Sequence, residues 1–522
     1  MIKSFLEKKK YELILIPLFL IALLLRIYNL GSHNLWFDEY ATFCLQSKFN
    51  LFELLRLAQY LLGGSLYYIL LKPWVIFFGK TEFALRSLSV LFGVLSILLI
   101  YKLGKLCFDK KVGLISAFLL TISPLHIWYA QEARPFAMST FLSMLTVYFF
   151  ISAIKNNKLT LWISFIVSSI LAVYTNYFCF YIPIISAGRF FTKKYRELKH
   201  GLLSFCIMIV IVLPLLPILM RQINFTKESF WITKPNLNSI VITFENFNLG
   251  YNATAWAYFL VFIFFSFLFI LGIRYWCSTK RIELLSLMLF LFVPIIFTYL
   301  ISQEIPVYID RYLMLFSPFY YIIIASGISE AKIYFAKLLI FISILLTFSL
   351  SIFNYYTYQM PVGVFHHQGV YAKKPFSPAA DYINKQFQEG DVIGYSEAEA
   401  MPIFYYIQDL IYKPIDIFVF LIKSNLGKYW NTIGSKYGYI HYITGFALPK
   451  LHVVGLGIEQ SYRNFQKYKF KRIWFITTSW ARDGILSPHA MNVRQWLQSH
   501  YSILETKEFE GIYIDLYEKN DD

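Results

Sequence analysis

The chain has 522 residues, of which 57% are hydrophobic, 20% aromatic and only 15% charged. Soluble domains carry about a quarter charged residues, so this composition excludes a soluble protein and indicates an integral membrane protein. Lysine and arginine (48) outnumber aspartate and glutamate (31), but the basic residues lie mostly between apolar runs. That distribution is typical of cytoplasmic loops, so no nucleic-acid partner is expected.

Long apolar runs predict about eleven transmembrane helices within a membrane domain, residues 1–354. The first run follows Lys8-Lys9-Lys10 and ends at Arg26 and Asn29 without a small-residue cleavage site, so we interpret it as an uncleaved helix. The runs are 11–30, 84–104, 113–127, 135–154, 159–175, 177–191, 201–219, 255–273, 283–301, 312–328 and 337–354.

The loop after the first run, residues 31–83, carries the adjacent carboxylates Asp38 and Glu39, preceded by Trp36. Two carboxylates beside aromatic residues at a membrane surface are costly unless they hold a cation or act as a general base. The alternative is that they only hydrate the start of a loop.

The rest of this loop predicts helices in the membrane interface. Residues 51–57 have amphipathic spacing, and the apolar segments 65–71 and 73–78 are too short to span alone. If residues 66–79 were a span, every later loop would change sides, and the charge pattern argues against this.

Alternate gaps between the runs are basic, which predicts a cytoplasmic N-terminus and an outer C-terminus. The residues in these gaps are Lys102, Lys105, Lys110 and Lys111, then Lys155 and Lys158, then Lys193, Lys194, Arg196 and Lys199, then Arg274, Lys280 and Arg281, and last Lys332 and Lys337. The loop 31–83, the turn at Arg134, the loop 220–254 and the segment at Asp310-Arg311 are then expected outside.

Residues 355–522 are expected to form an extracytoplasmic α/β domain. Ser377-Pro378 and Ser487-Pro488 predict helix starts, because serine caps a helix and proline suits its first position. Residues 391–395, 472–476 and 511–516 predict strands. No catalytic signature is found in this part of the chain.

Two further turns on the expected outer side carry charge. In the first, Arg134 follows His126, Gln131 and Glu132, and the arginine either pairs with Glu132 or binds a substrate. In the second, Arg311 and Tyr312 enter a span, so Arg311 needs an anionic partner outside. Asp310 or a lipid phosphate would serve as that partner.

Together these residues predict a site where a hydroxyl attacks while a lipid phosphate leaves. Asp38 would take the proton from the acceptor, and Arg134 and Arg311 would stabilise charge on the phosphate oxygens. No phosphate-binding loop or dinucleotide-binding glycine pattern is present. The five cysteines are dispersed without a CxxC pair, so no cofactor is expected, while dependence on a divalent metal is left open.

At these residues the chain resembles the bacterial branch of the GT-C membrane glycosyltransferases, glycosyltransferase family 39, the protein O-mannosyltransferase and aminoarabinose-transferase-like group. The resemblance extends over residues 11 to 330 and more loosely over the C-terminal domain. The matching motifs are Leu35-Trp36-Phe37-Asp38-Glu39, Leu66-Tyr67-Tyr68, residues 82–93, Ser123-Pro124-Leu125-His126, Gln131-Glu132-Ala133-Arg134-Pro135-Phe136, Tyr174-Thr175-Asn176-Tyr177 and Asp310-Arg311-Tyr312.

The resemblance implies an inverting transfer from a polyprenyl- or dolichyl-monophosphate sugar at the outer face of a cell membrane. It implies Asp38 as general base with Glu39 in support, and lipid-phosphate binding by Arg134, Arg311 and Tyr312. Trp36, Tyr67, Tyr68, His126, Gln131, Glu132 and Tyr177 would line the substrate site. The family often has a His or Lys followed by Pro-Pro before Leu-Tyr-Tyr, where this chain has Gly63-Gly64-Ser65, so that contact is either absent or supplied by Lys72.

Two other functions are compatible with an outer carboxylate and arginines. A flippase or transporter for a lipid-linked sugar predicts inverted repeats and charges at the membrane midplane. A polysaccharide ligase or polymerase with a diphosphate-linked donor would need the same kinds of residue, and only the family motifs argue against it. The sequence leaves open the sugar and whether the acceptor is a lipid, a protein or a polysaccharide.

Overall fold

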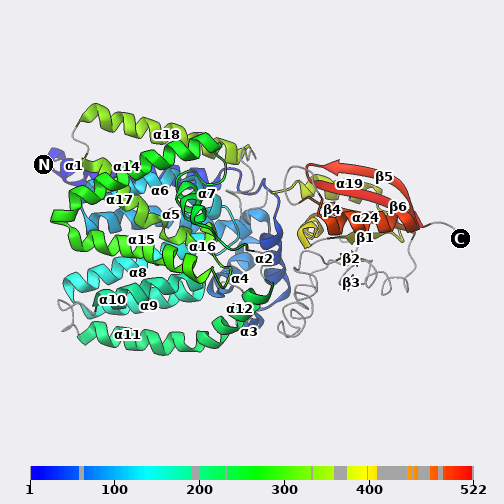
Figure 1. Ribbon diagram of the computed structural model, residues 1–522, viewed down its shortest axis with the longest axis horizontal. Helices are drawn as coiled ribbons and strands as arrows, with labels where there is room; N and C mark the ends of the chain where they lie inside the picture. Colours follow the sequence, from blue (N-terminus) through cyan, green and yellow to red (C-terminus); the bar gives the residue numbers. More distant parts are fainter. Residues whose placement is uncertain are drawn as a thin grey trace. The chain divides into compact units, whose positions relative to one another are not determined.

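The structure is a computed structural model, which describes residues 2–57, 64–190, 199–229, 232–330, 333–357, 373–396, 398–407, 444–447, 452–455, 471–479 and 486–519. The chain forms two compact units (Figure 1). The first comprises Met1–Leu30, Leu51–Ile223 and Ile232–Gln368, and the second comprises Gly31–Asn50, Asn224–Trp231 and Gly369–Asp522. Each unit is described by itself.

The described part of the first unit is helical. Its α-helices are α1 (Ile2–Ile27), α3 (Leu51–Leu57), α4 (Leu66–Phe78), α5 (Glu82–Cys107), α6 (Lys110–Ile122), α7 (Pro124–Ala130), α8 (Phe136–Asn156), α9 (Leu159–Thr175), α10 (Tyr181–Phe190), α11 (Lys199–Val212), the first part of α12 (Leu216–Ser229), α13 (Leu237–Leu249), α14 (Ala255–Thr279), α15 (Arg281–Ile301), α16 (Asp310–Leu313), α17 (Ser317–Glu330) and α18 (Tyr334–Tyr356). Short 3-10 turns η2 (Tyr177–Phe180), η4 (Leu213–Leu215) and η5 (Met314–Phe316) join some of them.

Within the described residues, seven helices are long and apolar enough to cross a membrane, and the bent pair α6–α7 makes an eighth if it is one span. Each of the eleven apolar runs is helical, but some helices are short. Helix α9 has 17 residues, and the run at 177–191 contains η2 followed by the ten-residue α10. The helical membrane fold is confirmed, while the number of spans and their orientation stay predictions.

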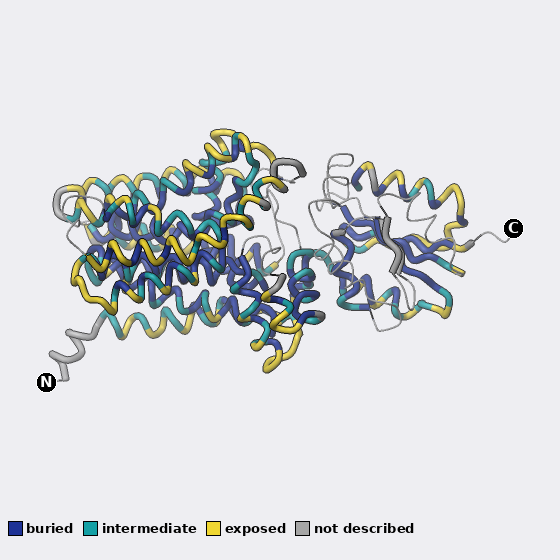
Figure 2. Tube along the Cα trace, turned by 90° about the horizontal axis from the view of Figure 1, so that it is seen from below, coloured by how far each residue is buried: buried dark blue, intermediate teal, exposed yellow. Residues whose placement is uncertain are grey.

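Close helix crossings in this unit depend on glycine. A Cβ atom added at Gly327 of α17 would lie 2.0 Å from the Leu268 carbonyl oxygen of α14, and one at Gly272 would lie 2.4 Å from the Ile323 carbonyl oxygen. These two backbones therefore approach as closely as small-residue membrane interfaces allow. In the helical segment Asp310–Glu330, which contains α17, 94% of the apolar window is buried. Figure 2 shows that the interior of this helical unit is largely buried while its outer helices are partly exposed.

Helix α18 has the opposite character. Only 22% of its apolar window is buried, and large apolar side chains such as Leu346 and Phe353 are exposed along it. Exposed apolar residues over the length of a span form the face that a helix presents to lipid.

The interfacial segments predicted in the first loop are helices α3 and α4. The two short segments expected around residue 72 form the single helix α4, with Pro73 inside it. Proline removes one backbone hydrogen bond and bends a helix without always ending it. Helix α4 ends instead at Gly79, whose positive φ of 85° suits glycine.

Helix α13 was not predicted. It begins with a capping box between Asn236 and Ser239, and its C-terminal half is buried. Thr243 hydrogen-bonds the hydroxyl of Tyr308, and the carbonyl of Leu249 accepts from Ser351. Polar contacts therefore hold this helix, which explains why an apolar pattern did not mark it.

The second unit contains a six-stranded sheet with the strand order β3-β2-β1-β4-β6-β5. The strands are β1 (Val392–Tyr395), β2 (Thr444–Ala447), β3 (His452–Gly455), β4 (Arg472–Thr478), β5 (Tyr501–Phe509) and β6 (Ile512–Lys519), and only β1 and β4 pair in parallel. Its helices are α2 (Phe37–Lys48), α19 (Phe376–Gln386), α20 (Ile403–Tyr406) and α24 (Pro488–His500), with a 3-10 turn η7 (Ala398–Ala400).

The three predicted strands and two predicted helices of the C-terminal part are present. Ser487 caps α24 by accepting from the amide of Ala490, as expected. At α19 the expected cap is wrong by two residues, because Pro375 is the N-cap and Ser377 lies inside the helix. Phe376 is buried in the core, so the helix begins earlier in the chain than the serine cap predicts.

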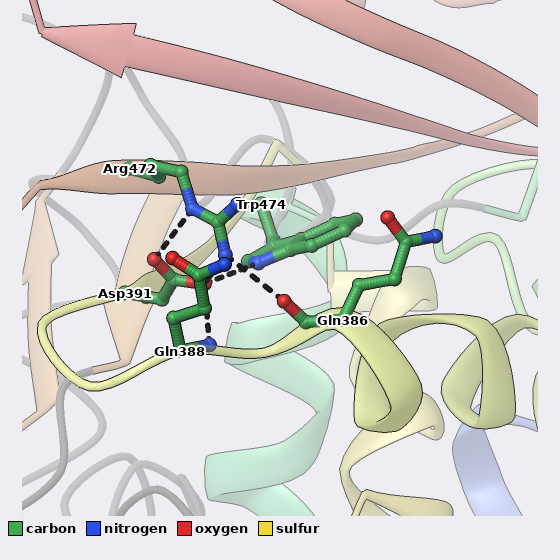
Figure 3. Close-up of polar contacts among 5 residues, drawn as sticks. All are labelled: Gln386, Gln388, Asp391, Arg472 and Trp474. Atoms are coloured by element: carbon green, nitrogen blue, oxygen red, sulfur yellow. Dashed lines mark hydrogen bonds and ion pairs between the residues drawn. The ribbon is translucent and has the colours of Figure 1, made fainter.

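A buried carboxylate ties α19 to the sheet (Figure 3). Asp391 accepts two hydrogen bonds from the guanidinium of Arg472, at 2.9 and 2.6 Å, and one from the indole of Trp474 at 2.9 Å. Arg472 also donates to the carbonyl of Gln386 at the end of α19. A buried charge with this many donors is fully compensated and rigid.

Helix α2 belongs to this second unit. Its residues Tyr40 and Cys44 share a hydrophobic core with Ala379 of α19, Trp474 of β4 and Ile514 of β6. The expected division placed the whole loop 31–83 with the membrane domain. The structure instead groups residues 31–50 with the C-terminal sheet domain.

Candidate functional site

The predicted site residues fall into two groups, one in each unit. Trp36, Asp38 and Glu39 lie in the second unit, and the arginines with the remaining candidates lie in the first.

The acidic pair occupies the first turn of α2, with Trp36 at the N-cap position. Carboxylates in the first turn interact favourably with the positive end of the helix dipole. The side chain of Asp38 is half-buried. The backbone carbonyl of Asp38 accepts from the hydroxyl of Thr42 one turn later, at 3.0 Å. Asp38 is thus the carboxylate of the pair that reaches the surface of this unit.

Glu39 has a different environment, although it is the next residue. It is completely buried, and its Oε2 lies 3.9 Å from the Nζ of Lys373, which is itself only 5% exposed. Successive residues of a helix point about 100° apart, so one carboxylate is directed inward while the other reaches the surface. Sequence reasoning missed Lys373. The signal was a pair of lysines, Lys373-Lys374, on the expected outer side.

In the first unit, the turn at Arg134 is joined to α4. The guanidinium of Arg134 donates to the hydroxyl of Tyr68 at 2.9 Å. Ser89 of α5 donates to the Arg134 carbonyl at 3.1 Å and hydrogen-bonds the hydroxyl of Tyr67 at 2.8 Å. The Leu-Tyr-Tyr motif and the arginine turn therefore form one polar cluster.

The second arginine lies at the start of α16. Arg311 is buried, with its guanidinium 5.5 Å from the ring of Tyr312. The neighbouring Asp310 accepts from the side-chain amide of Asn246 at 2.6 Å and from the backbone amide of Arg311 at 2.7 Å. Tyr251 also hydrogen-bonds Asp310. Asp310 therefore fixes the start of α16 to helix α13.

Aromatic contacts bring the two arginine turns together within the first unit. The ring of Tyr312, next to Arg311, lies 6.2 Å from that of Phe136, which is two residues after Arg134. It also lies 5.2 Å from Phe178, the neighbour of Tyr177. Tyr177 is half-buried and hydrogen-bonds Gln222. The structure thus places three of the sequence motifs side by side.

Glu132, two residues before Arg134 in the sequence, is buried. Its Oε1 accepts from the indole of Trp128 at 2.7 Å, a contact within the same turn. The ring of Trp128 also packs on Tyr251 at 5.3 Å. Glu132 therefore connects this turn to the aromatic residues around Asp310.

His126 and Gln131 hold the end of helix α1. Gln131 donates to the carbonyls of Arg26 and Tyr28, at 3.0 and 2.7 Å. The Nδ1 of His126 accepts from the guanidinium of Arg26 at 2.9 Å, which places the ring proton on Nε2. Both side chains are buried, so the structure gives each a packing role beside the substrate-lining role expected from the motif.

Arg26 also caps a broken helix. It is completely buried and donates to the carbonyls of Leu120 and Thr121, where α6 ends before the 61° bend into α7. The last carbonyls of a helix have no partner within it, and their negative end of the helix dipole favours a cation. The bend that carries the His126 and Arg134 motifs therefore depends on this arginine.

Lys72 lies in α4, half-buried. Burial lowers its pKa from the ordinary value, as does the charge of Lys80, while Glu53 opposes both. Just before α4, Gly64 has a φ of 112°, and a Cβ there would lie 2.6 Å from the Thr175 carbonyl oxygen. The departure from the family pattern at Gly63-Gly64-Ser65 thus coincides with a close backbone contact to α9.

Among the described residues, no group of three or more His, Cys, Asp or Glu side chains is arranged to hold a metal ion. Dependence on a metal stays open on this basis.

The family model described as dolichyl-phosphate-mannose-protein mannosyltransferase matches residues 66–220. The crystal structure of ArnT from Cupriavidus metallidurans in the apo state has a TM-score of 0.58 and 11% identity, over 96% of this chain and 97% of that chain. The same protein bound to undecaprenyl phosphate gives 0.57 and 11%, over 97% and 98%. The chain has the GT-C glycosyltransferase fold.

The GT-C match to ArnT extends over nearly the whole length of both chains, so it includes both units. An oligosaccharyltransferase from Archaeoglobus fulgidus, tethered with an acceptor peptide containing the NVT sequon, is 14% identical with a TM-score of 0.49. That likeness covers 74% of this chain and 58% of the archaeal one, so the chain spans little more than half of that relative. No curated protein sequence matches.

The family match and the candidate residues overlap only in part. The matched stretch contains Tyr67, Tyr68, Lys72, the 126–134 turn and Tyr177, and it ends before Arg311. It also begins after Asp38 and Glu39. Asp38, Glu39 and Arg311 lie outside the matched stretch, so their assignment to a site rests on their own chemistry.

Proposed function

We propose that this protein transfers a sugar from a polyprenyl-monophosphate donor to an acceptor hydroxyl, at the outer face of the cell membrane. Asp38 acts as the general base, and Arg134 and Arg311 bind the lipid phosphate, with Tyr312 and Lys72 beside them. The supporting observation is the convergence of the two arginine turns around Tyr312 in a GT-C fold. Guanidinium groups bind phosphate bidentately and stabilise a phosphate leaving group.

The relatives favour a lipid-phosphate donor. ArnT has been crystallised with undecaprenyl phosphate, and the matching family is named for a dolichyl-phosphate sugar. Attack by the acceptor on the face opposite the phosphate would invert the sugar, with Asp38 taking the hydroxyl proton and the phosphate leaving as an anion. The acceptor is a lipid, a protein or a polysaccharide hydroxyl.

The test of Asp38 is the purified full chain carrying Asp38→Asn, assayed with radiolabelled polyprenyl-phosphate sugars and a membrane extract. The change keeps the side-chain shape and removes the base, so we expect turnover to fall by about 10²–10⁴-fold. Binding of the donor and thermal stability should stay near those of the wild type. Wild-type turnover in this variant would remove Asp38 from the mechanism.

The test of the arginines is donor affinity. Arg134→Ala and Arg311→Ala should each weaken binding of the polyprenyl-phosphate sugar, because a charge-assisted hydrogen bond contributes about 1.5–3 kcal/mol. Binding of the same lipid without phosphate serves as control and should change little. Unchanged donor affinity in both variants would contradict the phosphate assignment.

A further inference from the structure

Besides the Lys373 contact, three interactions within the second unit fix the segment that carries the acidic pair. The backbone amide of Leu35 donates to the hydroxyl of Tyr406 at 2.8 Å, and Asn34 accepts from the amide of Ser377 at 3.3 Å. Phe43, on the same helix as the pair, packs edge-on against Tyr405 at 4.8 Å. The N-terminal turn of α2 is therefore fixed to α19 and α20, which are far away in the sequence.

Lys373 and Glu39 add a charge contact at the base of this arrangement. Both side chains are almost entirely removed from solvent, and their charged atoms are 3.9 Å apart. Removing one partner of a buried ion pair leaves an uncompensated charge, which is strongly unfavourable. The ion pair with Lys373 therefore stabilises the inward orientation of the Glu39 side chain.

The direction of Glu39 sets the direction of Asp38. Because the two residues are adjacent on one helix, rotation of α2 about its axis would move both side chains together. The core contacts of Tyr40 and Cys44 and the ion pair of Glu39 oppose that rotation. Asp38 is thereby left as the pair's surface carboxylate in a fixed orientation.

The elements that carry Lys373 are themselves rigid. Lys373 precedes α19 by three residues, and the end of α19 is tied to β4 through Asp391 and Arg472 (Figure 3). The neighbouring Lys374 donates to the carbonyl of Ser479 at the end of β4. The sheet domain therefore holds α19 at both ends. Lys374 contacts the end of β4 just before the helix starts, and Arg472 contacts its last residue, Gln386.

We propose that Lys373 is a positioning residue for catalysis, acting through the buried carboxylate of Glu39 to orient Asp38. The sheet domain then contributes to transfer by carrying the general base, in addition to any contact with substrate. This inference rests on the proposed function of Asp38. A general base displaced by about 1 Å can lose 10²-fold in rate, so positioning is sufficient for a large effect.

The test compares Lys373→Met, Lys373→Arg, Glu39→Gln and the double variant Glu39→Gln/Lys373→Met in the full chain, with Lys374→Met as the matched control. We expect Lys373→Met to lower kcat by about 10²-fold with the donor KM unchanged, since only the orientation of the base changes. Lys373→Arg should restore most of kcat. The double variant should lose no more than Lys373→Met, because the pair acts as a unit.

Lys374→Met removes the same kind of charge one residue later and should lower the melting temperature without lowering kcat per folded molecule. If Lys373→Met behaves like this control, the lysine is only structural and the inference is overturned. The Asp38→Asn variant separates the two proposals. Loss of turnover in Asp38→Asn with wild-type kcat in Lys373→Met sinks the inference alone, whereas full turnover in Asp38→Asn removes the proposed function.

Discussion

At the scale of single residues, the two halves of an acidic dipeptide have separate environments. Asp38 reaches the surface of its unit, and Glu39 is buried beside Lys373. The sequence motif shows both carboxylates alike, because adjacency along the chain says nothing about which side of a helix is covered. A pair of identical charges in a motif can therefore combine one reacting group with one that holds it in place.

Lys72 gives a prediction of pH dependence. Burial, assisted by Lys80, lowers its pKa, so its charge is lost at a lower pH than that of an ordinary lysine. If Lys72 binds the donor phosphate in its charged form, donor affinity is complete below that pKa and falls as pH rises through it. Donor affinity measured between pH 7 and 11 should fall earlier in the wild type than in Lys72→Arg, whose guanidinium stays charged. Identical profiles would exclude Lys72 from phosphate binding.

Asn246 gives a second prediction at this scale. Its amide donates to the buried carboxylate of Asp310 at 2.6 Å, and Asp310 holds the amide of Arg311. Asn246→Ala should destabilise the protein by about 1–3 kcal/mol, because a buried carboxylate loses one of its donors. It should also weaken donor binding through Arg311. Thermal unfolding and donor titration measure the two effects, and Asn156→Ala, at an exposed helix end, is the control.

The candidate residues could be predicted from the sequence to the extent that their types identify a chemistry. Arginines, tyrosines and carboxylates next to apolar runs indicated a polar site, and the structure brings the motifs of Arg134, Arg311 and Tyr177 together. Their partners could not be predicted. Asn246 and Lys373 contact residues far away in the chain, and neither lies in a periodic pattern that announces it.

At the scale of elements, apolar runs and serine-proline caps gave most helices and strands. Helix α13 was missed because hydrogen bonds rather than an apolar face hold it. The bend between α6 and α7 was missed because the run of apolar residues continues across it, and the break shows itself only through the cap at Ser123 and the distant Arg26. Counting spans from the lengths of apolar runs therefore fails where a helix is broken in this way.

The crossing of α14 and α17 gives a prediction at this scale. Gly327→Ala would place a Cβ 2.0 Å from the Leu268 carbonyl oxygen, which forces the buried helix α17 away from α14. We expect destabilisation by about 1–3 kcal/mol, measured as a fall in the melting temperature of the detergent-solubilised protein. Gly188→Ala in α10 is the control, since a Cβ there meets no atom within 4 Å, and it should be neutral or slightly stabilising. Equal effects of the two changes would contradict the close crossing.

At the scale of the whole molecule, the predicted orientation in the membrane rests on the distribution of basic residues alone. Cys277 is exposed next to Arg274 and Lys280, in a gap expected to face the cytoplasm. A membrane-impermeant maleimide should therefore label Cys277 in inside-out vesicles and leave it unlabelled in right-side-out vesicles. Glu304→Cys, in a background without Cys206 and Cys277, should give the reverse result. Labelling of both from one side would overturn the predicted orientation.

The grouping of residues 31–50 with the sheet domain could not be read from the chain. Sequence order places this loop between two membrane helices, and the predicted division therefore assigned it to the membrane domain. Its helix α2 is instead completed by a core whose other members begin after residue 370. A domain boundary drawn from hydropathy follows chain order, whereas a hydrophobic core joins segments without regard to it.

The burial of Arg26 has a consequence for biosynthesis. Its guanidinium is satisfied by the carbonyls of Leu120 and Thr121 and by His126, all of which are synthesised after nearly a hundred further residues. Until those residues leave the ribosome, the guanidinium has only the Ala22 carbonyl of its own helix as a partner, which is costly in hydrocarbon. We therefore expect the first helix to reach its final packing only after α6 has been inserted, so that this part of the bundle assembles in a fixed order.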